Sequence, residues 1–129
     1  NRLAENTLAS HLGIEVTEAG DDYLQARMPV NANTHQPMGV LHGGASVALA
    51  ETVGSIASVC CLEPGVEYAV GQEINANHLR PVSTGWVYAK ASPIHIGKRS
   101  HVWRIQIKDE AGRPVCESRI TMAVLAYNG

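Results

Sequence analysis

One segment restricts the fold more than any other part of the chain. Residues 43–62 form the longest apolar stretch, largely alanine, serine, valine and glycine, and Glu51 is its single charge. The length of this stretch favours an α-helix over a β-strand. A helix that carries apolar or small residues on all sides must be enclosed. The remainder of the chain therefore has to supply a surface that covers it.

The rest of the sequence predicts mainly strands. Residues 3–12 have the spacing of a short helix that ends at Gly13, and residues 29–38 have the composition of a loop. Alternating polar and apolar residues predict strands at about 14–17, 23–28, 67–79, 85–94, 100–108 and 115–125. We expect about six antiparallel strands curled around the long helix, which is an α+β domain.

Length and composition limit the class of protein further. A chain of 129 residues fits one domain, so we treat residues 1–129 as a single domain. A domain this small buries only about two-thirds of its surface, which favours oligomerisation. The absence of an apolar run of about 18 residues excludes a transmembrane helix. A net charge of -2 argues against a nucleic acid or an anionic membrane as partner, and an odd number of cysteines suits a cytoplasmic protein.

The first candidate for chemistry is Glu51, which lies in the middle of the apolar segment. A carboxylate is rarely buried without a partner, because its desolvation costs several kcal/mol. Glu51 either faces solvent or an arginine, or it is a functional carboxylate whose pKa is raised by its surroundings. Ser55 follows at i+4 and shares the same helix face, although a helical serine often bonds only to a backbone carbonyl.

The second candidate is the start of the helix, at His42-Gly43-Gly44. The first N–H groups of a helix have no partner within it and carry the positive end of its dipole, so they suit an oxyanion or a polarised carbonyl. A plain transition from loop to helix is the alternative. Gly43 and Glu51 lie about 12 Å apart along one helix axis, too far to act on one carbonyl carbon. If both act on it, they come from two antiparallel helices in two subunits.

The remaining polar candidates are Gln36 and His78, and we assign no role to His101. The cysteines and histidines match no zinc-ligand spacing, so we expect no metal. The sequence has no Gly-x-Ser-x-Gly elbow, dinucleotide fingerprint or P-loop, so we expect no bound cofactor.

Three segments together resemble the hotdog-fold acyl-CoA thioesterases that use glutamate as the acidic residue. They are residues 36–46 (QPMGVLHGGAS), 50–55 (AETVGS) and 75–81 (NANHLRP). That subgroup includes 1,4-dihydroxy-2-naphthoyl-CoA hydrolases and the proofreading thioesterases of enterobactin synthesis. The resemblance implies a curved antiparallel sheet around a central helix, paired into dimers that form tetramers.

Roles follow from the resemblance, position by position. Glu51 would be the nucleophile or general base, and the Gly43 N–H would polarise the thioester carbonyl. Gln36 and His42 would support that carbonyl and its loop. Ser55 and His78 would place the water or the acyl group.

Coenzyme A would be held near the surface. Residues 93–99 (PIHIGKR) resemble the family's CoA-facing segment. Arg80 and the run Gly97-Lys98-Arg99 are the candidates for its phosphates, because guanidinium groups suit phosphate geometry. Ordinary solvated charges are the alternative at each of these positions.

The leading hypothesis is hydrolysis of an aryl- or other bulky acyl-CoA to the free acid and CoA. One alternative is release of a thioester from an acyl or aryl carrier protein, which shares the pantetheine arm. Another is a non-catalytic acyl-CoA binding module, and the presence of Glu51, Gln36 and His42 together argues against it. The sequence leaves open whether Glu51 attacks directly or activates water.

Overall fold

The structure, a computed structural model, describes residues 6–127. Its elements are, in chain order, α1 (Leu8–Leu12), β1 (Glu15–Ala19), β2 (Leu24–Pro29), α2 (Gly43–Val59), β3 (Glu67–His78), β4 (Trp86–Ile96), β5 (Ser100–Lys108) and β6 (Pro114–Ala126). The strands form one six-stranded antiparallel sheet in the order β1-β2-β4-β5-β6-β3. The predicted α+β class is confirmed.

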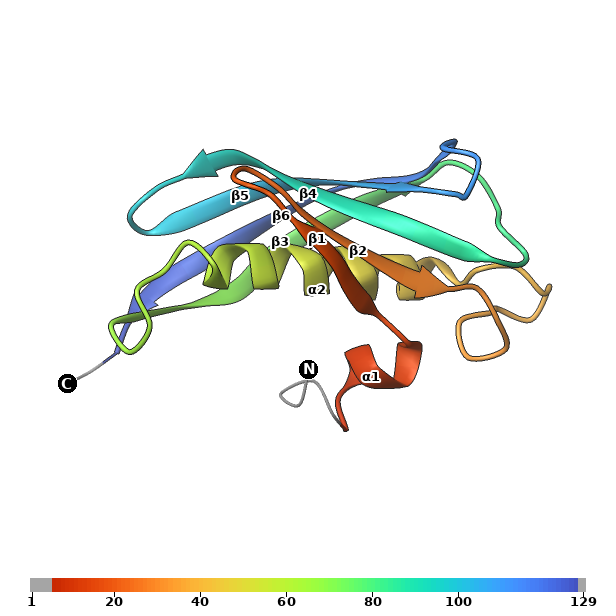
Figure 1. The fold of residues 1–129 in the computed structure, drawn as a ribbon, viewed down its shortest axis with the longest axis horizontal. Helices are drawn as coiled ribbons and strands as arrows, with labels where there is room; N and C mark the ends of the chain where they lie inside the picture. Colours follow the sequence, from red (N-terminus) through yellow and green to blue (C-terminus); the bar gives the residue numbers. More distant parts are fainter. Residues whose placement is uncertain (1–5, 128–129) are drawn as a thin grey trace.

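The long helix α2 runs along one face of the curved sheet (Figure 1). Its sheet side buries small and aliphatic residues, among them Leu49, Ala50 and Val53, all with no exposed surface. A Cβ added at Gly54 would come within 2.7 Å of Ile120 Cγ2. The helix therefore packs closer to β6 than a larger residue would permit, which explains the alanine, serine and glycine in this segment.

The helices differ from the prediction at their ends. Helix α1 begins at Leu8 with Thr7 as its N-cap, and residues 3–5 of the predicted helix lie outside the described residues. Helix α2 ends at Val59, three residues before the predicted end, because Cys60 already acts as its C-cap. Gly13 ends α1 as predicted, in the left-handed conformation that glycine readily adopts.

The expectation that α2 is enclosed holds only on its sheet side. Gly44, Glu51 and Val59 are exposed, so the side of α2 that carries them is not covered. The physical reason is that an open sheet covers one side of a helix, and a single chain adds little beyond the short α1. The uncovered side of α2 carries the one charge of the segment, Glu51.

A β-bulge in β3 sets which of its residues face α2. Gly71 pairs with Met122 and Glu73 pairs with Thr121, so Gln72 is an extra residue. One extra residue reverses the alternation of side chains along a strand. As a result, Ala69 before the bulge and both Ile74 and Ala76 after it pack against the core. The sequence predicts an unbroken strand here, so the bulge is a difference from that prediction.

Among the described helices, none has both the length and the apolar character needed to cross a membrane.

Candidate active site

The start of α2 is fixed by His42. Its side chain is the N-cap, and its Nδ1 accepts a hydrogen bond from the Gly44 N–H at 2.8 Å. A neutral imidazole that accepts at Nδ1 carries its proton on Nε2, so the exposed nitrogen of His42 is a donor. The Gly43 N–H stands at the first helical position, where the helix itself supplies no acceptor.

The loop before α2 is held in place by backbone hydrogen bonds. The His42 N–H donates to Thr34 O and the Leu41 N–H donates to Val82 O, both at 2.8 Å. Within the loop, the Met38 N–H donates to Oε1 of Gln36. This contact occupies the carbonyl end of the Gln36 amide and leaves its NH₂ group as a donor.

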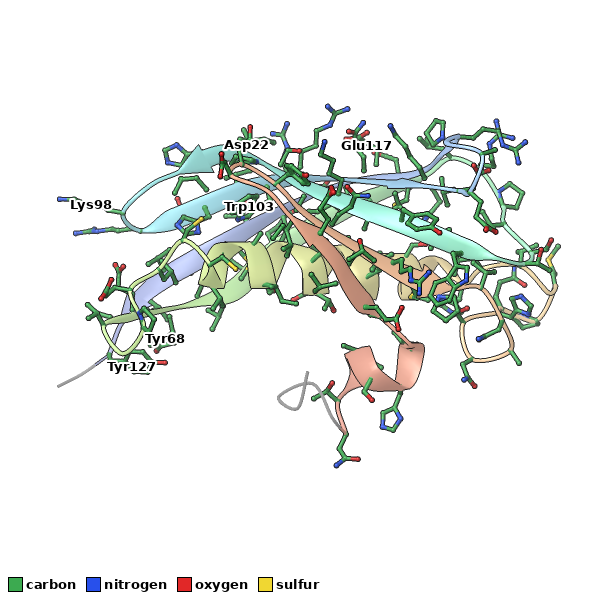
Figure 2. The ribbon with its side chains drawn as sticks, viewed as in Figure 1. Asp22, Tyr68, Lys98, Trp103, Glu117 and Tyr127 are labelled. Atoms are coloured by element: carbon green, nitrogen blue, oxygen red, sulfur yellow. The ribbon has the colours of Figure 1, made fainter. Side chains whose placement is uncertain are left out.

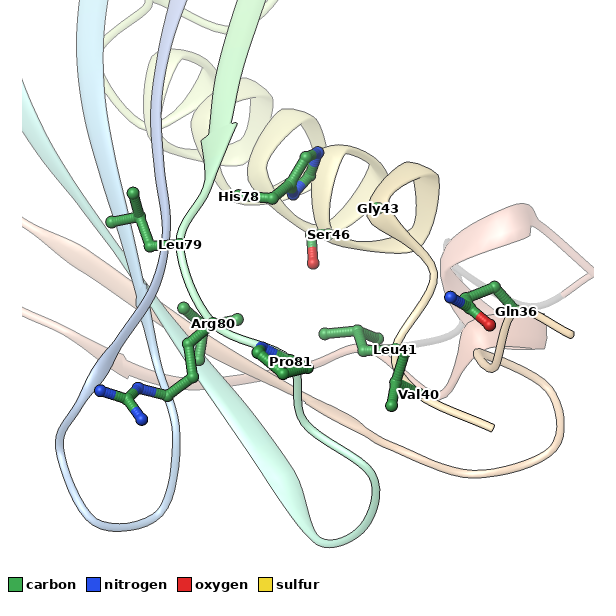
Figure 3. Close-up of a pocket in the computed structure, with 10 residues that line it drawn as sticks. Gln36, Val40, Leu41, Gly43, Ser46, His78, Leu79, Arg80 and Pro81 are labelled. Carbon is green, nitrogen blue, oxygen red and sulfur yellow. The ribbon is translucent and has the colours of Figure 1, made fainter. Parts of the chain in front are cut away.

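These groups border a cavity of about 410 Å³. Its walls are formed by Gln36, Val40, Leu41, Gly43, Ser46, His78, Leu79, Arg80, Pro81 and Val115 (Figure 3). The volume lies within the range typical of small-molecule sites. The cavity thus combines an apolar lining with a few N–H donors.

His78 lies directly over Gly43. A Cβ added at Gly43 would come within 2.9 Å of His78 Nε2, so a larger residue there would displace the imidazole ring from this position. The β3 bulge is what brings His78 to this side of the strand, two residues after Ala76. Figure 3 shows His78 and Gln36 on two sides of Gly43, while the Arg80 guanidinium extends away from the cavity.

The two predicted mid-helix residues lie elsewhere. Glu51 and Ser55 are not among the residues that line the cavity, and none of those lining residues carries a carboxylate. Glu51 is exposed, with its Oε2 beside Gly71 of β3. The Ser55 hydroxyl contacts Met122 Sδ at 3.8 Å, and Met122 is the strand partner of Gly71. Ser55 therefore lies near Glu51, apart from His78.

The candidates for CoA binding are also separated within one chain. Arg80 lines the cavity at the start of α2. Gly97-Lys98-Arg99 form the turn between β4 and β5, closed by a 2.8 Å hydrogen bond from the Gly97 N–H to Ser100 O. Lys98 stands at the tip of that turn (Figure 2), and the neighbouring Ile96 shares a cavity with Cys60 at the end of α2.

Sequence reasoning missed Gly71 and Ser46. A glycine inside a strand is the available signal for Gly71, since it often marks a bulge or a close approach. Ser46 is buried one helical turn after His42 and lines the cavity, but a serine in a helix of small residues gives no distinct signal. Within residues 6–127, no group of three or more His, Cys, Asp or Glu side chains is placed to hold a metal ion.

A helix wrapped by an antiparallel sheet, with N–H donors at the helix start, defines the hotdog-fold class. A thioesterase from Haemophilus influenzae shares this fold, with a TM-score of 0.95 and 52% identity over 98% of this chain and 87% of its own. Residues 38–116 match the model of the thioesterase superfamily.

Curated relatives agree with this match. The 1,4-dihydroxy-2-naphthoyl-CoA hydrolase of Escherichia coli is 49% identical over 97% of this chain and 91% of its own length. A proofreading thioesterase from Cronobacter turicensis is 51% identical over 97% of this chain and 90% of its own length. The chain belongs to the thioesterase superfamily and is a thioester hydrolase.

Proposed function

We propose that residues 1–129 act as one thioesterase domain that hydrolyses an aryl- or other bulky acyl-CoA to the free acid and CoA. Glu51 serves as nucleophile or general base, and each active site is built from two subunits. One observation carries this proposal. The cavity at the start of α2 collects N–H donors but no carboxylate, while Glu51 stands exposed about 12 Å further along the same helix.

Pairing of two copies through β3 would complete the site. β3 is one edge of the sheet and extends over 12 residues, with Tyr68 and Val70 exposed. The opposite edge, β1, has five residues, a bulge and exposed glutamates. A long, unblocked edge is a template for pairing with another strand. Antiparallel pairing of β3 with its copy places two α2 helices side by side, with Glu51 of one near Gly43 of the other.

The proposed chemistry uses the donors at the start of α2 to stabilise charge. The Gly43 N–H binds the thioester carbonyl, and the Gln36 amide supports it from the loop. In the nucleophilic route, the Glu51 carboxylate forms a bond to the carbonyl carbon and the C–S bond breaks, releasing CoA thiolate. Water then cleaves the mixed anhydride, and one of its protons is available to the thiolate.

In the general-base route, Glu51 takes a proton from water while the hydroxide adds to the carbonyl carbon. The C–S bond then breaks, and the proton passes to the thiolate. Single-turnover hydrolysis in ¹⁸O-labelled water tests for direct attack. Label in the Glu51 carboxylate requires an anhydride that water attacks at the Glu51 carbon. Label in the product acid alone is expected from the general-base route and also from an anhydride that water attacks at the acyl carbon.

The acyl group is proposed from the lining of the cavity and from a relative. The lining is largely apolar, with Val40, Leu41 and Val115 among its residues. The Escherichia coli relative is named as a hydrolase of an aromatic acyl-CoA. The second candidate substrate is a thioester on an acyl or aryl carrier protein, which shares the pantetheine arm, and one relative is named a proofreading thioesterase. A kinetic screen over aryl-, short- and long-chain acyl-CoAs and acylated carrier proteins separates the two.

The first test replaces the carboxylate. Glu51→Gln is nearly isosteric, so it should lower kcat on benzoyl-CoA about 10³-fold or more with an unchanged melting temperature. Release of free thiol gives the rate. A variant that keeps most of its kcat would remove Glu51 from the mechanism.

The second test asks whether one site needs two chains. Glu51→Gln is co-refolded with a Gln36→Ala, His42→Ala double variant. A mixed dimer then has one doubly damaged site and one intact site. Random mixing should restore about a quarter of the wild-type specific activity. Refolded Glu51→Gln alone is the control, and no recovery in a verified mixed dimer would assign the site to a single chain.

Light scattering measures the assembly, for which we propose dimers paired into tetramers. We place the enzyme in the cytoplasm, where exposed thiols such as Cys60 and Cys61 remain reduced. Cell fractionation tests this location.

A further inference from the structure

Gly71 lies at the middle of β3 and faces the Glu51 carboxylate. A Cβ built at Gly71 would stand 2.7 Å from Glu51 Oε2 and 3.6 Å from its Cδ. The next nearest atom, Ile120 Cδ1, is at an ordinary contact distance of 3.9 Å. The carboxylate therefore occupies the space that any side chain at position 71 would need.

The backbone gives no other reason for glycine at this position. Among residues 6–127, the glycines with positive φ are Gly13, Gly39, Gly65, Gly85 and Gly112, and Gly71 is not one of them. The extra residue of the bulge is Gln72, so the bulge does not require glycine at position 71. Glycine inside a strand lowers stability, because it loses more conformational freedom on folding and packs no side chain.

We infer that Gly71 is a positioning residue, which sets where the Glu51 carboxylate stands on the exposed side of α2. This inference rests on the proposed function. Met122, the strand partner of Gly71, contacts the Ser55 hydroxyl one helical turn beyond Glu51. Both polar side chains of the mid-helix site are therefore supported by the sheet. On β3, the absent side chain of Gly71 leaves space for Glu51. On β6, the sulfur of Met122 contacts Ser55.

The consequence of adding a methyl group follows from the same distances. Alanine at position 71 is compatible with the backbone, and the atom it would strike is the far end of a flexible side chain. The fold therefore tolerates the change, whereas the carboxylate has to move by a large fraction of an ångström. A displacement near 1 Å of a reacting group can cost about 10²-fold in rate.

The experiment is a double-mutant cycle between Gly71→Ala and Glu51→Asp, read as kcat and KM for benzoyl-CoA. In the wild-type background, Gly71→Ala should lower kcat about 10- to 100-fold with little change in KM. In the Glu51→Asp background the shorter side chain leaves room for the methyl group. There Gly71→Ala should lower kcat by less than about threefold.

Equal losses of kcat in both backgrounds, or full retention of kcat by Gly71→Ala, would overturn the inference. If Gly71→Ala lowers the melting temperature, the same change is measured in a Glu51→Ala background. A thermal loss that disappears there identifies the contact with Glu51 as its cause, and one that persists contradicts the inference. A Glu51→Gln variant with near-wild-type kcat would instead refute the proposed function.

Discussion

The polar groups at the two ends of α2 differ in whether they already have hydrogen-bond partners. At its start, the Gly43 N–H and the Gln36 amide border an open cavity. Near its end, Ser58 Oγ accepts a hydrogen bond from Trp103 Nε1 at 2.7 Å and bonds to His101 Nδ1 at 2.9 Å, and all three residues are buried. Satisfied buried groups support the fold, whereas donors that face a cavity are available to a ligand. One helix would therefore carry the proposed active site at its start and a buried structural hydrogen-bond network near its end.

The largest expected loss of activity comes from Gly43→Ala, which is compared with Gly54→Ala on the same helix. Gly43→Ala would push His78 away from the helix start, since the added Cβ would lie 2.9 Å from its Nε2. We expect kcat/KM to fall about 100-fold with an unchanged melting temperature. Kinetics on benzoyl-CoA and thermal denaturation measure the two effects.

Gly54→Ala is the matched control. Its Cβ would strike Ile120 Cγ2 inside the core, and overpacking typically costs about 1–3 kcal/mol, partly offset by the better helix propensity of alanine. We expect lower stability with kcat retained. This division of roles along α2 would be wrong if Gly54→Ala reduced kcat as strongly as Gly43→Ala does.

The next largest expected effect is a loss of stability when the buried hydrogen bonds near the end of α2 are removed. Ser58→Ala removes the shared partner of His101 and Trp103 and leaves a buried ring nitrogen and an indole N–H unsatisfied. Each unsatisfied buried group costs about 1–3 kcal/mol, so we expect the free energy of unfolding to fall by about 2 kcal/mol or more. Urea denaturation measures this change.

Trp103→Phe in the Ser58→Ala background provides the check. Without the indole N–H, less of the penalty of Ser58→Ala remains, so the two substitutions should couple. Strictly additive losses would show that the hydrogen bond contributes little. kcat should stay near the wild-type value in the single Ser58→Ala variant.

The sequence was informative where one local pattern decides the structure. The apolar length of residues 43–62 predicted α2, and the residues His42-Gly43-Gly44 predicted its start. The alternating segments predicted the six strands of the sheet. Each of these inferences depends on neighbours in sequence, and the structure confirms each element within a few residues.

Features that depend on contacts between residues far apart in the chain could not be predicted from the sequence. The bulge at Gln72 depends on how β3 meets β6, and it determines that His78 reaches Gly43. His101 was given no role, because its partner Ser58 is 43 residues away in the chain. The glycine at position 71 was visible, but its meaning required the position of the Glu51 carboxylate.

A smaller effect is a pH dependence of stability that comes from the buried end of α2. Burial lowers the pKa of His101 below its ordinary value of 6.5, opposed by Glu67 and assisted by His95. The folded protein then binds fewer protons than the unfolded chain, so this stability is present above pH 6.5 and is lost as the pH falls below it. The loss is at most about 1.4 kcal/mol per pH unit.

Urea denaturation at pH 7.5 and 5.5 compares the wild type with His101→Gln. Because the two proteins differ only at position 101, the difference between the two pH dependences is assigned to His101. We expect the variant to lose less stability on acidification. An equal or larger loss in His101→Gln would contradict this assignment.

The smallest expected effect is on KM for the acyl-CoA, and it concerns two cations near opposite ends of α2 that would both contact CoA. Arg80 lies at the start of the helix, and Lys98 lies in the β4–β5 turn beyond its other end (Figure 2). In an antiparallel pair of helices, the turn that holds Lys98 would approach Arg80 of the partner, so both cations would reach one CoA. Exposed ion pairs contribute about 0.2–1 kcal/mol, so Arg80→Ala and Lys98→Ala should each raise KM for benzoyl-CoA by up to about fivefold, without loss of kcat.

Lys90→Ala is the matched control, because it also removes a lysine charge but not one proposed to contact CoA. The Lys90 ammonium group lies 4.7 Å from the centre of the Tyr23 ring. It should leave KM unchanged, and high salt should reduce the effects at Arg80 and Lys98. The free energies of the two substitutions should add, since the two cations would contact different phosphate groups. A rise in KM for Arg80→Ala alone would mean that CoA is held at one end of the helix, and that the β4–β5 turn carries an ordinary solvated charge.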